Sequence, residues 1–354
     1  MVGTSQNIKE ASIMKKCLSA FLAAVLVLSL AACGSAPAPA PAPASSADAS
    51  GAPESSASTA RAGKINLIIG TGGVGGTYYP LGGALAKVWT SNMEGVSVAA
   101  QSTGASVENT ALIENNEIEL GLTQNDLAEY AVKGEYMFDK EYKKLKVIGR
   151  LYSEDIQVFV REDAGINSIS DMKGKRISLS YPGSGANANA EQILGVFGIT
   201  PDDVKAEYPS NSDTADRIKD GLLDGMLTTT GAPNATFQEM CMSAKVKLLS
   251  FTDEELDQII AKYPFFAKKT LPAGMYEGQT EDVHTVCVQS ILVASADLDE
   301  DLVYDLTKTL WENQGELSGM LAALNDLSVD KALDGITVDY HPGAIKYYKE
   351  IGKM

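Results

Sequence analysis

A glycine-rich turn between a predicted strand and a predicted helix constrains the fold of this chain most. Residues 65–69 form a short apolar run rich in isoleucine, which is typical of a buried parallel strand. Five glycines follow within residues 70–76, and a helical pattern of apolar residues begins after Pro80. A strand, a glycine loop and a helix in this order direct backbone N–H groups and the positive end of a helix at one point. The sequence therefore predicts a cradle for a carboxylate or a phosphate.

The same order of elements recurs along the chain. Further strands, each ending in small or polar residues before a helix, are predicted at 96–100, 118–123 and 175–180. Such alternation indicates a parallel α/β sheet whose loops gather at the carboxyl ends of the strands. The loop 181–187 then repeats the small-residue turn of the first unit ahead of a helix predicted at 188–197.

Two segments are predicted to connect two such units. The apolar runs 145–149 and 156–160 follow each other with no helix between them, and a long β run returns over 283–294. The predicted fold is therefore α/β, of two lobes joined by a hinge with two crossings, and 354 residues suffice for both lobes. The predicted lobes are residues 64–157 with 285–354, and residues 158–284.

The first 63 residues predict export. A basic pair at 15–16 precedes an apolar stretch, 20–30, that is shorter than the ~20 residues of a spanning helix. The Leu-Ala-Ala-Cys-Gly sequence ending at residue 34 resembles a bacterial lipobox, so residues 1–32 are interpreted as a lipoprotein signal peptide and Cys33 as the lipidated residue. An ordinary cleaved signal and a buried core segment are the alternatives.

Two further features belong to this terminal region. The true start of the signal is predicted at Met14. Residues 33–63 are mostly Ala, Pro, Ser and Gly, a composition that cannot bury enough surface to fold. We expect a disordered tether that holds the folded part away from a membrane.

Composition excludes several classes of function. A formal net charge of −17 argues against nucleic-acid binding and against a basic membrane-surface patch. Two histidines and no Cys/His spacing predict no metal site, and no cofactor is expected. With Cys17 and Cys33 in the terminal region, only Cys241 and Cys287 remain, either paired in an oxidising compartment or as two free thiols.

The motifs that would indicate an enzyme are incomplete. The glycines of 70–75 fit the GxGxxG fingerprint of dinucleotide binding, but the acid expected after the second strand is replaced by Gln101-Ser102-Thr103. A plain tight turn is the other alternative to an anion cradle. Ser184 lies in a Gly-Ser-Gly turn without the GxSxG spacing of a nucleophile, so it is interpreted as a donor at a helix N-terminus or a turn residue. We predict that the chain is not an enzyme.

Uncharged polar residues gather at the predicted strand ends. They bind polar ligands without the desolvation cost of a buried charge, although capping and turn formation are alternatives. These residues are Gln101, Thr103, Ser106, Asn109, Gln124 and Asn125. Arg150 is a candidate carboxylate partner, or it takes part in a surface or hinge ion pair. Asp126 would repel an anion or hold an ammonium group. The helix that begins near Ser106 is expected to pack inward through Val107, Ala111 and Leu112.

Several motifs together resemble one known family. They are Gly-Thr-Gly-Gly-Val-Gly-Gly-Thr-Tyr-Tyr-Pro from residue 70, Gln-Ser-Thr-Gly-Ala-Ser-Val-Glu-Asn from 101, Gly-Leu-Thr-Gln-Asn-Asp from 121, Pro-Gly-Ser-Gly from 182 and His-Pro-Gly-Ala-Ile-Lys-Tyr-Tyr from 341. Their order, from about Lys64 to the end, is similar to that of the TAXI-type solute-binding proteins of TRAP transporters. The resemblance implies a type II periplasmic-binding-protein fold outside the membrane. It implies capture of a small anionic or zwitterionic solute, such as glutamate, glutamine or a 2-oxoglutarate-like acid, for a TRAP permease.

The family's ligand loops give a set of expected site residues. By that resemblance they are Gly73, Val74, Gly75, Thr77, Tyr78, Gln101, Thr103, Ser106, Gln124, Asn125, Ser184, Gly185, Ala186, Gly231 and Pro233. Two departures from the family pattern, Gly104-Ala105 and Gly231-Ala232-Pro233, alter the expected pocket wall. A domain that feeds a sensor, or an exported enzyme, remains the alternative function.

Overall fold

The computed structural model describes residues 63–354. The predicted signal peptide, Cys33 and all of the predicted tether except Gly63 lie outside these residues. Within 63–354, every helix is too short or too polar to cross a bilayer.

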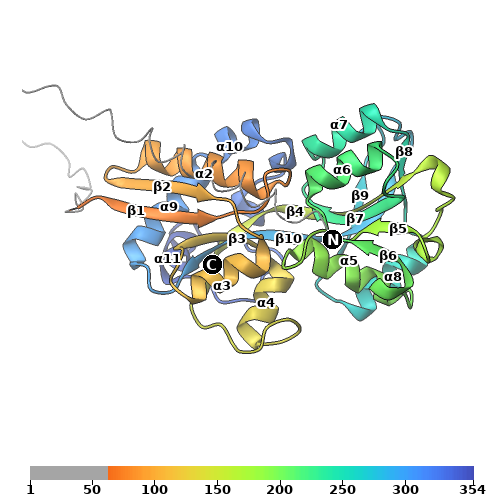
Figure 1. The fold of residues 1–354 in the computed structure, drawn as a ribbon. Coiled ribbons are helices and arrows are strands. Elements are labelled where there is room, and N and C mark those ends of the chain that lie inside the picture. The colour runs from red at the N-terminus through yellow and green to blue at the C-terminus, as the bar shows by residue number, and fades with distance from the viewer. Residues whose placement is uncertain (1–62) are drawn as a thin grey trace, which may run out of the picture. The chain divides into compact units, whose positions relative to one another are not determined.

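Two α/β lobes share one sheet (Figure 1). The elements of the first lobe are β1 (Ile65–Gly70), α2 (Tyr78–Asn92), β2 (Val96–Gln101), α3 (Ser106–Glu114), β3 (Leu120–Gln124), α4 (Asn125–Lys133), α9 (Glu300–Glu312), α10 (Gln314–Met320), η4 (Ala322–Leu324), η5 (Val329–Lys331) and α11 (Pro342–Glu350). The elements of the second lobe are η1 (Glu162–Ala164), η2 (Ile169–Met172), β5 (Arg176–Ser178), α5 (Gly185–Val196), η3 (Pro201–Asp203), β6 (Lys205–Glu207), α6 (Asn211–Lys219), β7 (Gly225–Thr230), α7 (Ala235–Ser243), β8 (Val246–Leu248), α8 (Asp253–Lys262) and β9 (Ala267–Leu271).

Two long strands, β4 (Leu145–Arg161) and β10 (Val283–Ser295), run through both lobes. The strand order is β2-β1-β3-β10-β4-β7-β5-β6, and β10 pairs antiparallel with both β3 and β4. The two predicted crossings are therefore one pair of adjacent strands. The pairs within each lobe, such as β1 with β2 and β5 with β6, are parallel as expected, whereas the crossing strands are antiparallel to their neighbours.

The apolar runs 145–149 and 156–160 belong to a single strand. The polar residues between them interrupt the apolar pattern, yet Arg150, Glu154 and Asp155 are all buried. The chain between the runs is thus the middle of β4 and not a loop.

Of the predicted inward residues of α3, Val107 and Leu112 are partly buried against an apolar core, but other residues of the helix are buried more deeply. Its buried residues are Ser106, Asn109, Thr110 and Ile113, because Asn109 Nδ2 donates to the carbonyl oxygens of Thr71 and Leu122, each at 2.7 Å. A buried amide that joins the ends of β1 and β3 replaces apolar packing at this position. The helix α5 also begins three residues earlier than predicted, at Gly185.

Separate apolar cores support the lobes. Leu85, Trp89 and Trp311 lie in the core of the first lobe, and Ile177, Ile193 and Leu227 lie in that of the second. Cys241 and Cys287 are both buried and unpaired.

Candidate functional site

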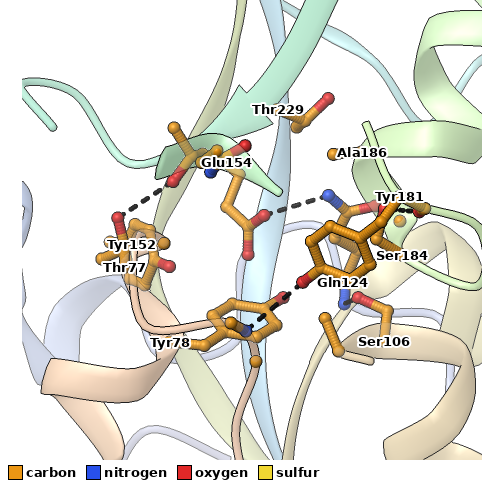
Figure 2. Close-up of a pocket in the computed structure, with 17 residues that line it drawn as sticks. Thr77, Tyr78, Ser106, Gln124, Tyr152, Glu154, Tyr181, Ser184, Ala186 and Thr229 are labelled. Carbon is orange, nitrogen blue, oxygen red and sulfur yellow. Dashed lines mark hydrogen bonds between the residues drawn. The ribbon is translucent and has the colours of Figure 1, made fainter. Parts of the chain in front are cut away.

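A cavity of about 40 Å³ lies where the loops at the strand ends of the two lobes meet (Figure 2). This volume holds a few water molecules. The lobes contact each other directly around it, so the structure describes a closed form.

Backbone and side-chain hydrogen bonds join the lobes at the rim of the cavity. The N–H of Gly73 donates to Tyr181 Oη at 3.4 Å, and Thr77 Oγ1 lies 3.0 Å from Thr230 Oγ1. The N–H of Val107 donates to the carbonyl of Gly183 at 3.2 Å.

The first glycine loop is shaped by hydrogen bonds to the neighbouring strand end. Thr71 Oγ1 donates to the carbonyl of Gln101 at 2.6 Å, and Ser102 Oγ donates to the carbonyl of Gly72 at 2.9 Å. These bonds hold Gly72 and Gly73 against the cavity, while Tyr78, the first residue of α2, is buried beside them.

The N-terminus of α5 forms the facing wall. Ser184 caps this helix, since its Oγ accepts from the N–H of Asn187 at 3.1 Å. The first N–H groups of a helix have no acceptor within it, so those of Gly185 and Ala186, which both line the cavity, are available to a ligand. A Cβ atom on Gly185 would collide with the end of the Gln124 side chain, so Gly185 and Gln124 lie in close contact here.

The acidic residue in the cavity is Glu154, which the sequence analysis did not select. Its side chain projects from β4 into the cavity, and one carboxylate oxygen accepts from Gln124 Nε2 at 3.0 Å (Figure 2). The residue is only 3% exposed, and its Oε1 has no hydrogen-bond partner. Burial raises the pKa of Glu154 to about 7.

A second acid lies close to this site without lining the cavity. Asp126, in the first turn of α4, accepts from Asn189 Nδ2 of the other lobe at 2.9 Å. Burial raises the pKa of Asp126 to about 7. One buried carboxyl group thus lines the cavity, and a second lies close to it.

The structure brings about half of the predicted site residues together. Those that line the cavity are Gly73, Thr77, Tyr78, Ser106, Gln124, Ser184, Gly185 and Ala186. Those that lie outside it are Val74, Gly75, Gln101, Thr103, Asn125, Gly231, Pro233 and Arg150. Tyr152, Glu154, Tyr181, Asn211, Thr229 and Thr230 line the cavity but were not predicted.

Several of the outlying residues have structural partners. Arg150 Nε donates to Gln289 Oε1 at 2.6 Å, and its Nη2 lies 3.5 Å from Asp326, which corresponds to the hinge ion pair considered above. Asn125 Nδ2 donates to the carbonyl of Gly335 at 2.9 Å, and Thr103 Oγ1 donates to that of Thr71 at 3.0 Å.

The tip of the first glycine loop points away from the cavity. Val74 is 68% exposed, and together with Gly75 and Pro233 it lines a separate hollow that α7 and residues 320–323 complete. The carbonyl of Gly75 accepts from Thr236 Oγ1 at 3.2 Å, a further bond between the lobes. Gly75 therefore takes part in closure and does not contact the cavity.

Within residues 63–354, no group of three or more His, Cys, Asp or Glu side chains is arranged to hold a metal ion. The donors around the cavity are uncharged, and its one ionisable acid is Glu154.

Comparison with known proteins supports the fold. The profile of the NMT1-like family matches residues 69–352. The periplasmic binding protein BugD superposes with a TM-score of 0.52 at 13% identity, over 82% of this chain and 94% of BugD. A protein from Bordetella bronchiseptica RB50 gives a TM-score of 0.51 at 15% identity, over 82% of this chain and 90% of that one. The chain has the type II periplasmic-binding-protein fold, and the predicted fold class is confirmed.

Proposed function

Because this chain belongs to the NMT1-like family, we propose that it is an extracytoplasmic solute-binding protein that captures a small solute between its lobes and delivers it to a membrane permease. The observation that carries this proposal is the cavity itself. Both lobes contribute to it, and it contains buried polar atoms without partners, among them Glu154 Oε1 and the hydroxyl of Tyr152. Buried polar atoms are usually satisfied, so this cluster is expected where a ligand supplies the missing bonds.

The order of events follows from the contacts of the closed form. A solute carboxylate binds the N–H groups at the start of α5, because this region presents donors that have no acceptor within the helix. The bonds from Gly73 to Tyr181 and from Thr77 to Thr230 exist only when the lobes meet. Closure is thus favoured by contacts that the open form lacks.

The finer parts of the proposal rest on the sequence motifs. Their order resembles that of TAXI-type proteins, which supports a TRAP permease as the receiving partner. The lipobox-like segment supports attachment through Cys33 at the outer face of the cell membrane. We extend the proposal to a solute that carries a carboxylate, of the size of glutamate, glutamine or 2-oxoglutarate. We also propose that the two lobes comprise residues 64–157 with 285–354, and residues 158–284.

A thermal-shift screen of amino acids and small carboxylates tests the function. A solute at 100 times its Kd stabilises the folded state by about 2.7 kcal/mol, which corresponds to a rise in Tm of several degrees for a chain of this size. We expect such a rise for one chemical class of solute and no chemical conversion of that solute. A solute that is consumed on incubation, or a screen without any shift, would contradict the proposal.

A further inference from the structure

We propose that Glu154 is the counter-charge for a cationic nitrogen of the solute, so that this site selects an amino acid over the keto acid of the same skeleton. The inference rests on the proposed function and names the class of solute that the cavity takes. It begins from the position of Glu154 in the middle of β4, where this residue pairs with Val288 of β10.

The carboxyl group of Glu154 lacks a protein cation. Among the described residues that line the cavity, none is a lysine, an arginine or a histidine. The nearby cations have other partners, since Arg150 bonds to Gln289 and Lys269 donates to Ser153 Oγ at 2.9 Å and lies 3.9 Å from Asp155. A buried carboxylate without a partner is unfavourable by several kcal/mol, and an ammonium group would remove that penalty.

The atoms around Glu154 are suited to an ammonium group. An ammonium donates three hydrogen bonds and accepts none. Glu154 Oε1 is buried without a hydrogen-bond partner, and the buried hydroxyls of Tyr78 and Ser290 lie against the same carboxyl group. Figure 2 shows the Glu154 carboxyl group pointing between Tyr78 and Gln124 toward the centre of the cavity. These oxygens supply the acceptors that one ammonium requires.

The opposite wall is suited to a carboxylate. Gly185 and Ala186 line the cavity at the positive end of α5 with N–H groups that have no acceptor within the helix, and Ser184 already satisfies the N–H group of Asn187. The cavity therefore has one pole of donors and one pole of acceptors. An α-amino acid carries the matching pair of charges on adjacent carbon atoms, in a group small enough for both poles to reach.

The same arrangement disfavours a purely anionic solute. A keto acid would place a carbonyl oxygen, an acceptor, against the oxygens of Glu154, Tyr78 and Ser290. The tyrosine and serine hydroxyls can turn to donate, but an ionised carboxylate cannot, and like charges in a buried site repel. Selectivity between the two classes therefore depends on Glu154.

The cavity volume adds one requirement. About 40 Å³ is too small for an amino acid in addition to the present side chains. Binding must therefore occur with the lobes further apart, or with Gln124 turned away from Glu154. Gln124 Nε2 now donates to Glu154 at 3.0 Å. If Gln124 turns away, the solute ammonium takes the position of this nitrogen.

The test compares the wild type with Glu154→Gln by calorimetric titration at pH 8, using the twenty amino acids and the keto acid that corresponds to each. In the wild type we expect at least one amino acid to bind at least ~30-fold more tightly than its keto acid, because loss of a partner from a buried charge pair costs 2 kcal/mol or more. In Glu154→Gln the affinity for that amino acid should fall by a similar factor, and the preference over the keto acid should largely disappear.

Glu108→Gln is the matched control. Glu108 lies on α3 close to the cleft, is exposed and accepts from the N–H of Gly104, a bond that a glutamine oxygen can keep. Its affinities should equal those of the wild type. Thermal unfolding of both variants establishes that they fold.

The outcomes separate this inference from the proposed function. Equal affinity for an amino acid and its keto acid, or an unchanged amino-acid affinity in Glu154→Gln, overturns the role of Glu154 while capture of a solute stands. Binding of no amino acid, together with binding of another small anion in the thermal-shift screen, overturns the inference alone. Binding of no solute in either experiment overturns both.

Discussion

Ionised Glu154 lowers the free energy of unfolding of the solute-free protein, but it strengthens the binding of an amino acid. Its folded-state pKa of about 7 exceeds its ordinary value of 4.5, because burial disfavours the charged form. The folded protein therefore holds a proton that the unfolded chain releases between these two pH values. The stability associated with this proton is fully present below pH 4.5 and is lost as the pH rises to about 7.

The first prediction concerns the free energy of unfolding without solute. Glu154→Gln replaces a group that is ionised at pH 8 with a neutral one of the same shape, so we expect stabilisation on the order of 1–3 kcal/mol at pH 8. Urea unfolding at pH 4.5 and pH 8 measures this, and the variant should show a weaker decline of stability with pH. Part of the decline in the free energy of unfolding with rising pH will remain in the variant, because burial also raises the pKa values of Asp126 and Asp155 to about 7.

A stability of Glu154→Gln below that of the wild type at pH 8 would contradict this interpretation. Glu108→Gln, an exposed change with the same alteration of charge, should shift the free energy of unfolding by less than about 0.5 kcal/mol at either pH.

The second prediction concerns the pH dependence of amino-acid binding. The ammonium group requires an ionised Glu154, and with a pKa of about 7 this form is scarce at pH 5.5. The affinity should therefore fall by up to ~30-fold between pH 8 and pH 5.5. Tyr78, Tyr152, Tyr181 and Asp126 also face this carboxyl group, and of these only Asp126 titrates nearby, so its own variant, Asp126→Asn, is measured in parallel.

Calorimetry across this range provides the measurement. The affinity of Asp126→Asn for the amino acid should still fall as the pH falls, and that of Glu154→Gln should not. A wild-type affinity that rises on acidification would show that Glu154 acts as a protonated donor.

Sequence reasoning found the donors of the site better than its acid. Gln124, Ser184 and Gly185 follow predicted strands, and the ends of parallel strands meet, so position alone indicates them. Glu154 lies between two apolar runs that were interpreted as one crossing, and the local pattern did not indicate that a polar residue there is buried. Only the pairing of β4 with β10 shows that this residue is buried. Asp126 was correctly considered near the cleft, but it contacts Asn189 and does not line the cavity.

At the scale of elements, the contact of α9 with α11 explains a glycine near the C-terminus. Gly343, in the first turn of α11, packs so closely that a Cβ atom would collide with backbone atoms of Glu300 and Tyr304 in α9. Backbone atoms cannot turn aside as the end of a side chain can. Tyr348 extends the same contact, since its hydroxyl accepts from Trp311 Nε1 and donates to the carbonyl of Ile148, both at 2.9 Å.

The third prediction is that Gly343→Ala destabilises the protein by about 1–3 kcal/mol, because the two helices must separate. Gly83→Ala is its control, as Gly83 is an exposed residue within α2 with no atom within 4 Å of an added Cβ. That change should stabilise the protein by up to about 1 kcal/mol. Urea unfolding measures both, and equal stability of the two variants would show that α11 can shift without cost.

Some sequence patterns predicted the positions and buried faces of the elements better than others. The apolar runs 145–149 and 156–160 located β4 correctly, because tertiary packing agrees with the local pattern there. On α3 the same reasoning found only part of the packing, since Val107 and Leu112 are partly buried against a core but Asn109 is buried for its hydrogen bonds. Periodicity cannot distinguish a buried amide from an exposed one.

At the scale of the whole described chain, closure determines affinity. Gly75 lies against Ser212 of α6, and an added Cβ would collide with the Ser212 side chain and lie 3.1 Å from its backbone nitrogen. The collision arises only when the lobes are together, so it raises the free energy of the closed form and leaves each lobe intact.

The fourth prediction follows from this geometry. Gly75→Ala should weaken solute binding by ~10-fold or more, mainly through faster dissociation, with little change in the Tm of the solute-free protein. Stopped-flow binding and thermal unfolding measure the two quantities, with Gly83→Ala as the control. An unchanged dissociation rate would show that Gly75 does not take part in closure.

The pair of crossing strands and the two α/β lobes were predictable at this scale, because glycine-rich turns after strands recur in both halves of the sequence. The single continuous sheet was not, since antiparallel pairing of β4 with β10 depends on segments more than 120 residues apart in the chain. The contacts that join the lobes, such as Thr77 with Thr230, also involve side chains that no local pattern distinguishes.

The central claim is that facing turns of the two lobes enclose the solute beside Glu154. A crystal structure of the chain with the solute chosen by the thermal-shift screen tests it most directly. The account predicts the solute carboxylate at the N–H groups of Gly185 and Ala186, with its nitrogen within hydrogen-bond distance of Glu154. A solute bound elsewhere, for example in the hollow beside Val74 and Pro233, would contradict it.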